Sequence, residues 1–189
     1  MSLLAMRRKQ AHASGLNNRQ KYGEQPKQII QKGDRQMKLT VYLSGEIHTD
    51  WRDEVASACA KQNLDVMFLG PVTDHAASDD CGVEIMGAEP DKFWHDHKGA
   101  KLNAIRTRTA ISRADVVVVR FGEKYKQWNA AFDAGYAAAL GKALIIMHGS
   151  DHQHALKEVD GAALATVETA DQVAAILDYV ITGKLPAAS

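Results

Sequence analysis

The 189-residue sequence predicts an α/β domain built on a doubly wound parallel sheet. Five short apolar runs follow residue 37, and segments with helical periodicity separate them. Polar residues of unusual types gather just after the first four runs, at the edge where parallel sheets bind ligands. The length suits one domain with a sizeable hydrophobic core. We therefore expect a single domain over residues 37–189, with a ligand site at the carboxyl edge of its sheet.

The five predicted strands differ in how strongly the sequence marks them. ADVVVVRF (114–121) is the most β-branched run and predicts a central, buried strand. KLTVYLSG (38–45) is similarly apolar, and we expect it to pair with that strand near the middle of the sheet. The other three strands are expected within residues 64–70, 142–148 and 161–167.

Helices are expected between the strands, several of them with recognisable caps. The expected helices and caps are 50–62 (Thr49 or Asp50), 101–113, 129–141 (Asn129 and Gly141), 150–159 (Ser150 with Gln153) and 169–183 (Thr169 with Gln172, then Gly183). Residues 70–100 are polar and contain several Gly and Pro residues, so they predict a long loop.

Charge divides the chain into two parts. Residues 1–36 hold eight Lys or Arg against Glu24 and Asp34, which predicts a basic, polar N-terminal arm. The remainder has 15 basic and 21 acidic residues, a net charge of −6. An acidic domain binds phosphate backbones poorly, so we do not expect nucleic acid as its partner.

Several classes of protein are disfavoured by missing signals. Cys59 and Cys81 form neither a zinc spacing nor a disulfide framework, which favours reduced thiols in the cytoplasm. No apolar run reaches the length of a transmembrane helix, and MSLLAMRRKQ lacks the hydrophobic region of a signal peptide. Histidine pairs at 95/97 and 152/154 lack a third ligand, and no dinucleotide or P-loop motif is present. The sequence thus predicts a cytoplasmic protein with no membrane segment, metal or cofactor.

One acid is out of place in the predicted helix 129–141. Asp133 lies among small and apolar residues that predict a helix packed on all sides, and no basic residue stands at helical spacing from it. It can be a surface acid near a helix N-terminus, where the dipole favours it by ~0.3–1 kcal/mol. It can also be a nucleophile or electrostatic stabiliser at the mouth of the sheet. The residues alone leave both interpretations open.

Three motifs of the chain resemble those of the nucleoside 2-deoxyribosyltransferase superfamily. They are VYLSGEI (41–47), ADVVVVRF and NAAFDAGYAAALGK (129–142). More narrowly, the chain resembles the YtoQ family from about Met37 to Tyr179, including PVTDHAASDDCGV (71–83) and FWHDHKGAKLNAIRTRT (93–109).

The resemblance implies a flavodoxin-like (Rossmann-like) three-layer domain, usually oligomeric, that breaks an N-glycosidic bond through a glycosyl-carboxylate intermediate. The superfamily's nucleophilic Glu falls on Asp133. Two further acids of the superfamily fall near Thr107 and on residues 127–129, where this sequence has no carboxylate. Glu46 and Asp80 are the candidate replacements in catalysis, with Asp74 a third possible proton donor, since glycosidic cleavage needs an acid near the leaving base.

The remaining candidates would contact substrate. Arg106 can bind a 5′-phosphate or belong to a solvated face, Trp128 can stack on a base or pack in the core, and the loop with Asp74 and His75 can line the site or be solvated. The full set of candidate substrate-binding residues is Tyr42, Ser44, Gly45, Asp74, His75, Asn103, Arg106, Arg120, Glu123, Trp128 and Asn129.

Two functions remain open from the sequence. The first is a 2-deoxyribosyltransferase or N-glycoside hydrolase acting on a nucleoside or nucleotide through a carboxylate nucleophile. The second is a non-catalytic protein that binds or senses a nucleotide derivative and keeps only the pocket. Either one predicts a small-molecule partner, and the resemblance implies a homo-oligomer.

Overall fold

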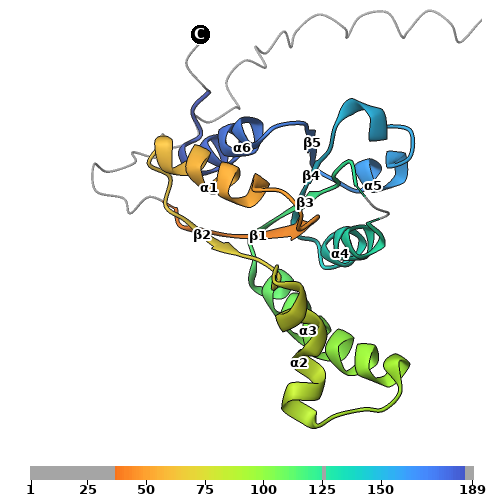
Figure 1. The fold of residues 1–189 in the computed structure, drawn as a ribbon. Helices are drawn as coiled ribbons and strands as arrows, with labels where there is room; N and C mark the ends of the chain where they lie inside the picture. Colours follow the sequence, from red (N-terminus) through yellow and green to blue (C-terminus); the bar gives the residue numbers. More distant parts are fainter. Residues whose placement is uncertain (1–36, 125–126, 186–189) are drawn as a thin grey trace, which may run out of the picture. The chain divides into compact units, whose positions relative to one another are not determined.

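The computed structural model describes residues 37–124 and 127–185, and the predicted arm 1–36 lies outside them. Its five strands form one parallel sheet in the order β2-β1-β3-β4-β5 (Figure 1). The strands are β1 (Leu39–Gly45), β2 (Val66–Leu69), β3 (Val116–Arg120), β4 (Ala143–Met147) and β5 (Ala165–Val167). The predicted five-stranded parallel sheet is confirmed, with β3 at its centre and β1 beside it.

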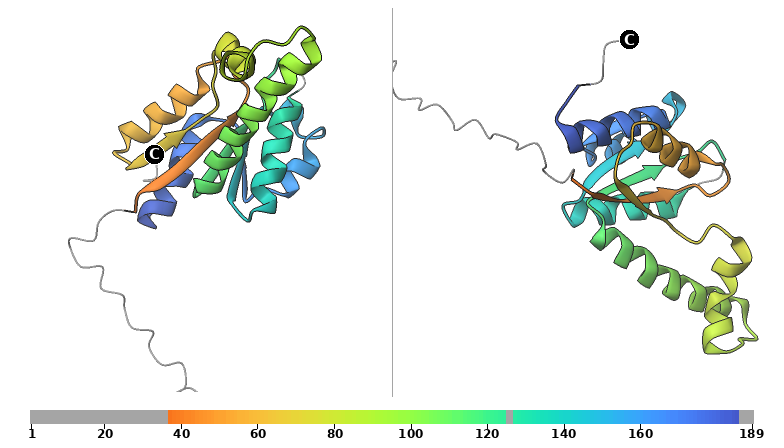
Figure 2. Two further views of the ribbon diagram at one scale, coloured as in Figure 1. Left: turned by 90° about the horizontal axis from the view of Figure 1, so that it is seen from below. Right: turned by 90° about the vertical axis from the view of Figure 1, so that its left-hand side faces the viewer.

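Helices cover both faces of the sheet and complete three layers (Figure 1, Figure 2). The helices α1 and α6 pack on one face, and α3, α4 and α5 lie on the other. Their bounds are α1 (Trp51–Lys61), α2 (His75–Met86), α3 (Lys92–Arg113), α4 (Trp128–Ala139), α5 (Lys157–Gly161), α6 (Ala170–Thr182) and the 3₁₀ turn η1 (Ser150–His152).

Successive side chains of a strand point to opposite faces of the sheet, and in the described residues they form two separate hydrophobic clusters. In β1, Val41 and Leu43 join the cluster under α1 and α6, whereas Tyr42 joins the cluster under α3 and α4. All of these side chains are buried, as expected for interior strands of a parallel sheet. Since Ser44 lies two residues beyond Tyr42, the pleat directs it to the α3–α4 side as well.

The predicted loop over residues 70–100 is wrong, because this stretch forms α2 and the first turns of α3. Asp74 and Asp91 cap the two helices through their carboxylates, with Asp74 accepting from the Ala77 amide at 2.7 Å. Gly82 lies against Gly99, where an added Cβ would come within 2.4 Å of the Gly99 nitrogen. The glycines that suggested a loop therefore let two helices approach closely, and the hairpin extends beyond the sheet (Figure 2).

Two predicted helix starts also differ. Gln127, not Asn129, occupies the N-cap of α4, and its side chain does not cap the helix. The expected helix 150–159 is divided into η1 and α5, with no side-chain cap from Ser150. By contrast, the capping box of Thr169 and Gln172 at the start of α6 is confirmed, because Thr169 accepts from the Gln172 amide and the Gln172 side chain accepts from the backbone in return.

Within the described residues, no helix has the length and apolar character needed to cross a membrane.

Candidate active site

The strand order changes direction between β1 and β3, since the chain goes from β1 outward to β2 and then returns to β3. Ligands of such sheets bind at this switch point, beyond the carboxyl ends of the two strands. The strand ends are held together by the Glu46 amide, which donates to the Arg120 carbonyl at 3.2 Å. Gly45 has a φ of +112°, and a Cβ there would lie 2.0 Å from the Arg120 oxygen. The close approach of β1 and β3 therefore requires glycine at this position.

Asp133 of α4 reaches this region from the side. The Ser44 hydroxyl, at the end of β1, donates to Asp133 Oδ2 at 2.5 Å. Because α4 begins at Trp128, Asp133 lies in its second turn, beyond the strongest influence of the helix N-terminus. Burial raises the pKa of the Asp133 carboxyl above its ordinary value, while the Ser44 hydrogen bond opposes that rise. Ser44, rather than the helix dipole, is thus the main stabiliser of the ionised form.

Tyr42 lies two residues before Ser44, and the charge of Asp133 acts on its hydroxyl. The ring is 1% exposed, and its hydroxyl donates to Thr107 Oγ1 of α3 at 3.4 Å. Burial raises the pKa of Tyr42, and the charge of Asp133 adds to the rise, against the effects of Thr107, Arg52 and Arg106. The Tyr42 hydroxyl is consequently protonated at neutral pH, and it is close enough to the Asp133 carboxylate to interact with it electrostatically.

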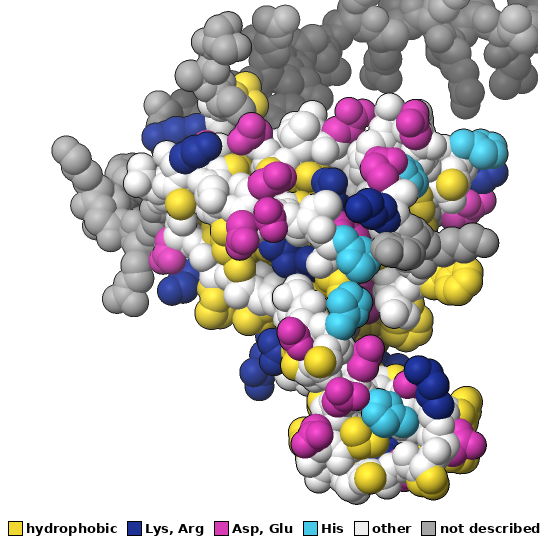
Figure 3. Space-filling model, in the orientation of Figure 1, with side chains coloured by type: hydrophobic (Ala, Val, Ile, Leu, Met, Phe, Trp, Pro, Cys, Tyr) yellow, Lys and Arg dark blue, Asp and Glu magenta, His cyan; other side chains and the backbone are white. Residues whose placement is uncertain are grey.

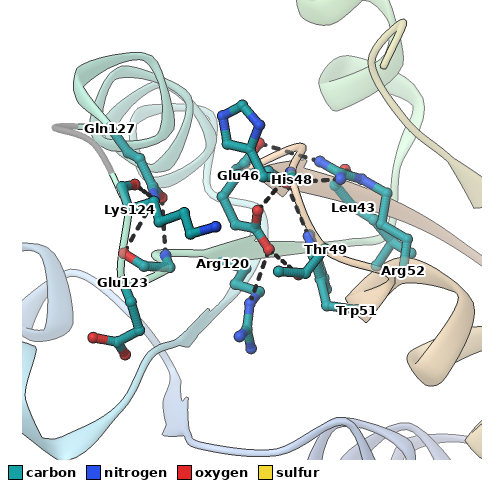
Figure 4. A network of polar contacts seen from close by, with 12 residues as sticks. Leu43, Glu46, His48, Thr49, Trp51, Arg52, Arg120, Glu123, Lys124 and Gln127 are labelled. Carbon is teal, nitrogen blue, oxygen red and sulfur yellow. Dashed lines mark hydrogen bonds and ion pairs between the residues drawn. The ribbon is translucent and has the colours of Figure 1, made fainter. Parts of the chain in front are cut away.

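Glu46 is buried at the end of β1 and lies within a network of donors (Figure 4). Its carboxylate accepts from the His48 amide at 2.7 Å and from the Thr49 hydroxyl, and Arg120 Nε lies 3.3 Å away. Burial alone would raise its pKa, but these hydrogen bonds and the nearby positive charge lower it overall. The Glu46 carboxylate is ionised and already accepts hydrogen bonds from the protein. It is therefore better suited to hold Arg120 in place than to give a proton to a leaving base. The predicted catalytic role of Glu46 stays a prediction.

Two residues that the sequence prediction omitted organise the loops of the site. Arg52 donates to the carbonyl oxygens of Leu43, Gly45 and Glu46, three acceptors at and just beyond the end of β1. Gln127 donates to the Gly122 carbonyl and accepts from its amide, in a two-bond contact that closes the loop after β3. Arg52 lies in the first turn of α1, the helix that follows β1, and this position was its only indication in the sequence. Gln127 was noticed only as a position without the expected acid.

Replacement of Glu46 by Gln is expected to lower the free energy of unfolding by about 1–3 kcal/mol at pH 7, because Arg120 loses a buried anionic partner. A depressed pKa gives stability that is present above the unfolded pKa and is lost as the pH falls through the folded pKa. The difference from wild type should therefore shrink below about pH 4.5, the ordinary Glu value. Urea unfolding at pH 7 and pH 4 measures it; a difference that does not change with pH would contradict the assignment.

The predicted site residues of the hairpin have structural partners in α2 and α3. Asp74 caps α2, and His75 begins that helix with its ring stacked on His48 at 5.7 Å. The Asp80 carboxylate lies 3.2 Å from His95 Nε2 of α3. Asn103 donates to the carbonyl and hydroxyl oxygens of Ser78. These contacts hold the hairpin together, and His75 is the member that connects to the loop after β1.

The other predicted binders lie around the carboxyl edge. Arg106 donates to the Gly70 carbonyl at 3.4 Å, in the segment that follows β2. Glu123 is exposed and lies 3.9 Å from His152 Nδ1. Trp128 and Asn129 form the exposed first turn of α4, with Trp128 74% exposed. In the described part of the chain, no group of three or more His, Cys, Asp or Glu side chains is arranged to hold a metal ion.

Sheet order, layers and site together define a flavodoxin-like α/β protein with a carboxylate at its switch point. The family model of nucleoside 2-deoxyribosyltransferase YtoQ matches residues 42–181, so the chain belongs to this family. An uncharacterized protein YtoQ from Bacillus subtilis (strain 168) is 44% identical over 144 residues, which cover 76% of this chain and 97% of that protein.

Solved structures are similar at lower identity. A conserved protein from Enterococcus faecalis V583 is 12% identical with a TM-score of 0.53, over 76% of this chain and 99% of its own. A 2-deoxyribosyltransferase from the psychrotolerant bacterium Bacillus psychrosaccharolyticus is 16% identical with a TM-score of 0.44, over 71% of this chain and 90% of its own. At such identities, the Enterococcus structure supports the fold alone.

Proposed function

We propose that this protein cleaves the N-glycosidic bond of a nucleoside or nucleotide, with Asp133 as the nucleophile. The observation that carries the proposal is the Ser44–Asp133 pair: a half-buried carboxylate, oriented by a hydroxyl and without a described cationic partner, at the switch point of the sheet. Membership of a family described as nucleoside 2-deoxyribosyltransferases supports this class of substrate.

The proposed reaction has two displacements. Asp133 Oδ1 attacks C1′ of the sugar and forms a glycosyl ester, while the C1′–N bond breaks and its electron pair leaves with the base, which takes up a proton. A second base or a water molecule then attacks C1′, gives up a proton, and releases the Asp133 carboxylate. Water makes the enzyme a hydrolase and a base makes it a transferase. Asp80 and Asp74 remain the sequence-predicted proton donors for the leaving base.

The competing proposal is a non-catalytic protein that binds a nucleotide derivative. What favours it is the network around Glu46 and Gln127, because both side chains near the switch point are already engaged with the protein. In this case the site holds a ligand without forming an ester.

Incubation with a panel of deoxynucleosides, ribonucleosides and their 5′-monophosphates separates these functions. Chromatography should detect free base from at least one member, and a second base added to the mixture should yield a new nucleoside if transfer competes with hydrolysis. Saturable binding without release of base from any panel member would favour the non-catalytic protein.

We also propose that the chain forms a homo-oligomer through the outer face of α4. Phe132 of α4 is 59% exposed and Leu140, the C-cap residue of the helix, is 44% exposed, although the sequence predicted a helix packed on all sides. Figure 3 shows hydrophobic side chains on the surface of this region and of the hairpin. We expect a second copy of the chain to cover this face. A stable interface buries about 800 Å² per partner, so neighbouring elements would take part as well.

Replacement of Phe132 by Glu is expected to reduce the molar mass of the particle to that of one chain, because the apolar ring is lost and a charged group takes its place at an apolar interface. Light scattering after size-exclusion chromatography measures it. Tyr179 is similarly exposed on α6, in the opposite layer, and Tyr179→Glu is the matched control that should keep the wild-type mass. An unchanged mass for Phe132→Glu would remove α4 from the interface.

A further inference from the structure

We infer that Ser44 is a positioning residue that selects which oxygen of Asp133 reacts and assists release of the sugar from it. The inference rests on the proposed function of Asp133 as a nucleophile. It assigns to Ser44 a contact with the carboxylate, whereas the sequence predicted a contact with substrate.

The first observation is the geometry of the pair. Ser44 is 2% exposed, and its hydroxyl lies 2.5 Å from Asp133 Oδ2. The other oxygen, Oδ1, accepts no hydrogen bond from any residue that the structure describes. The two oxygens of a carboxylate are chemically equivalent until one of them accepts a hydrogen bond that the other lacks. Here Ser44 holds Oδ2, so Oδ1 is the oxygen left to meet the sugar.

The second observation is the rigidity of the donor. Ser44 belongs to β1, paired in register with Val119 of β3, one residue before the Gly45–Arg120 contact. The hydroxyl is thus fixed by the sheet, whereas Asp133 is carried by α4. One hydrogen bond joins the two elements at the reacting group and limits rotation of the carboxylate about χ2. Ser44 therefore fixes the orientation of the Asp133 carboxylate relative to the sheet.

The two displacements use this hydrogen bond differently. When the ester forms, charge leaves the carboxylate and the bond from Ser44 weakens. When the ester breaks, the C1′–Oδ1 electron pair returns to the carboxylate and spreads onto Oδ2, where the Ser44 hydroxyl already points. A donor aimed at developing charge lowers the barrier of that step. Ser44 consequently favours breakdown of the glycosyl ester over its formation.

Ser44→Ala tests this assignment. With the best nucleoside of the panel, kcat should fall about 10- to 100-fold, the effect of losing one hydrogen bond to a charged group. The acid limb of the pH profile should move to higher pH, because the bond that opposes the burial-raised pKa of Asp133 is gone. Acid-quenched protein should carry a larger fraction of glycosyl adduct, measured by intact mass. Ser44→Thr keeps the hydroxyl and should restore both properties.

The matched control is Ser112→Ala, which removes an exposed serine hydroxyl that donates to the Arg108 carbonyl in the last turns of α3. It should leave kcat, the acid limb and the adduct fraction at wild-type values. If Ser44→Ala lowers only the melting temperature, with the acid limb and adduct fraction unchanged, Ser44 is structural and the inference is overturned.

A readout without substrate separates this inference from the proposed function. Carbon-13 NMR follows titration of the Asp133 carboxyl, assigned by its disappearance in Asp133→Asn. Ser44→Ala should titrate at higher pH than wild type whether or not any nucleoside is cleaved. A titration midpoint identical to wild type overturns the role of Ser44. Absence of base release by wild type, with a shifted midpoint, overturns the proposed chemistry and leaves the positioning contact in place.

Discussion

Asp133→Asn is expected to lower turnover about 10³-fold or more, because an amide cannot form the glycosyl ester. The side chain keeps its size, and its amide oxygen can still accept from Ser44. Since burial disfavours the ionised carboxyl in the folded protein, removing the charge should leave the melting temperature at or slightly above the wild-type value. Chromatography of released base and thermal unfolding measure the two effects.

Asp133→Glu is the informative partner of that variant. It keeps a carboxylate that can form the ester, so turnover should be reduced less than in Asp133→Asn. The extra methylene moves this carboxylate away from the position set by α4 and Ser44, so some activity should still be lost. An Asn variant that releases base as fast as wild type, with intact folding, would show that Asp133 is an ordinary helix acid. Loss of activity together with a large fall in melting temperature would assign it to the fold.

Gly45→Ala is expected to have the largest effect on stability. The added Cβ would lie 2.0 Å from the Arg120 carbonyl oxygen, and the φ of +112° is itself unfavourable for alanine. Both problems lie at the junction of the two interior strands. The expected loss exceeds ~4 kcal/mol, a large part of the stability of an ordinary domain. Urea unfolding of the purified variant, or its failure to accumulate as folded protein, is the measurement.

Gly135→Ala provides the matched control for this substitution. Gly135 is an exposed residue within α4, and an added Cβ meets nothing within 4 Å. Alanine there should stabilise the helix by about 0.5–1 kcal/mol. If both glycine variants changed stability equally, crowding between β1 and β3 would not explain the need for Gly45.

The sheet could be predicted from the sequence because its signals are local and repeated. Four consecutive valines in β3 and the nearly continuous apolar residues of β1 are typical of central parallel strands, whatever the rest of the chain does. The hairpin could not be predicted in this way. Gly82 and Gly99 usually interrupt helices, and only their contact across α2 and α3 explains them, a relation between residues 17 apart in the sequence.

The candidate site was predictable in its position but not in its contacts. The sheet topology alone places Ser44, Glu46 and Arg120 at one edge. Which side chains then pair depends on the path of each loop: Glu46 turns toward His48 and Thr49, and Ser44 meets Asp133 from another element. Arg52 was overlooked because its acceptors are backbone carbonyls, which carry no signature in the sequence.

The glycine contact between α2 and α3 has a consequence for how this family can diversify. Only Gly82 of α2 is buried, and the hairpin is held by its own caps and pairs, such as Asp80 with His95. Substitutions toward its tip therefore draw little on the stability of the central sheet. Selection can alter that end while the base, where His75 meets His48, stays in register with the loop after β1. Sequence changes at the tip can then accumulate without rebuilding the core.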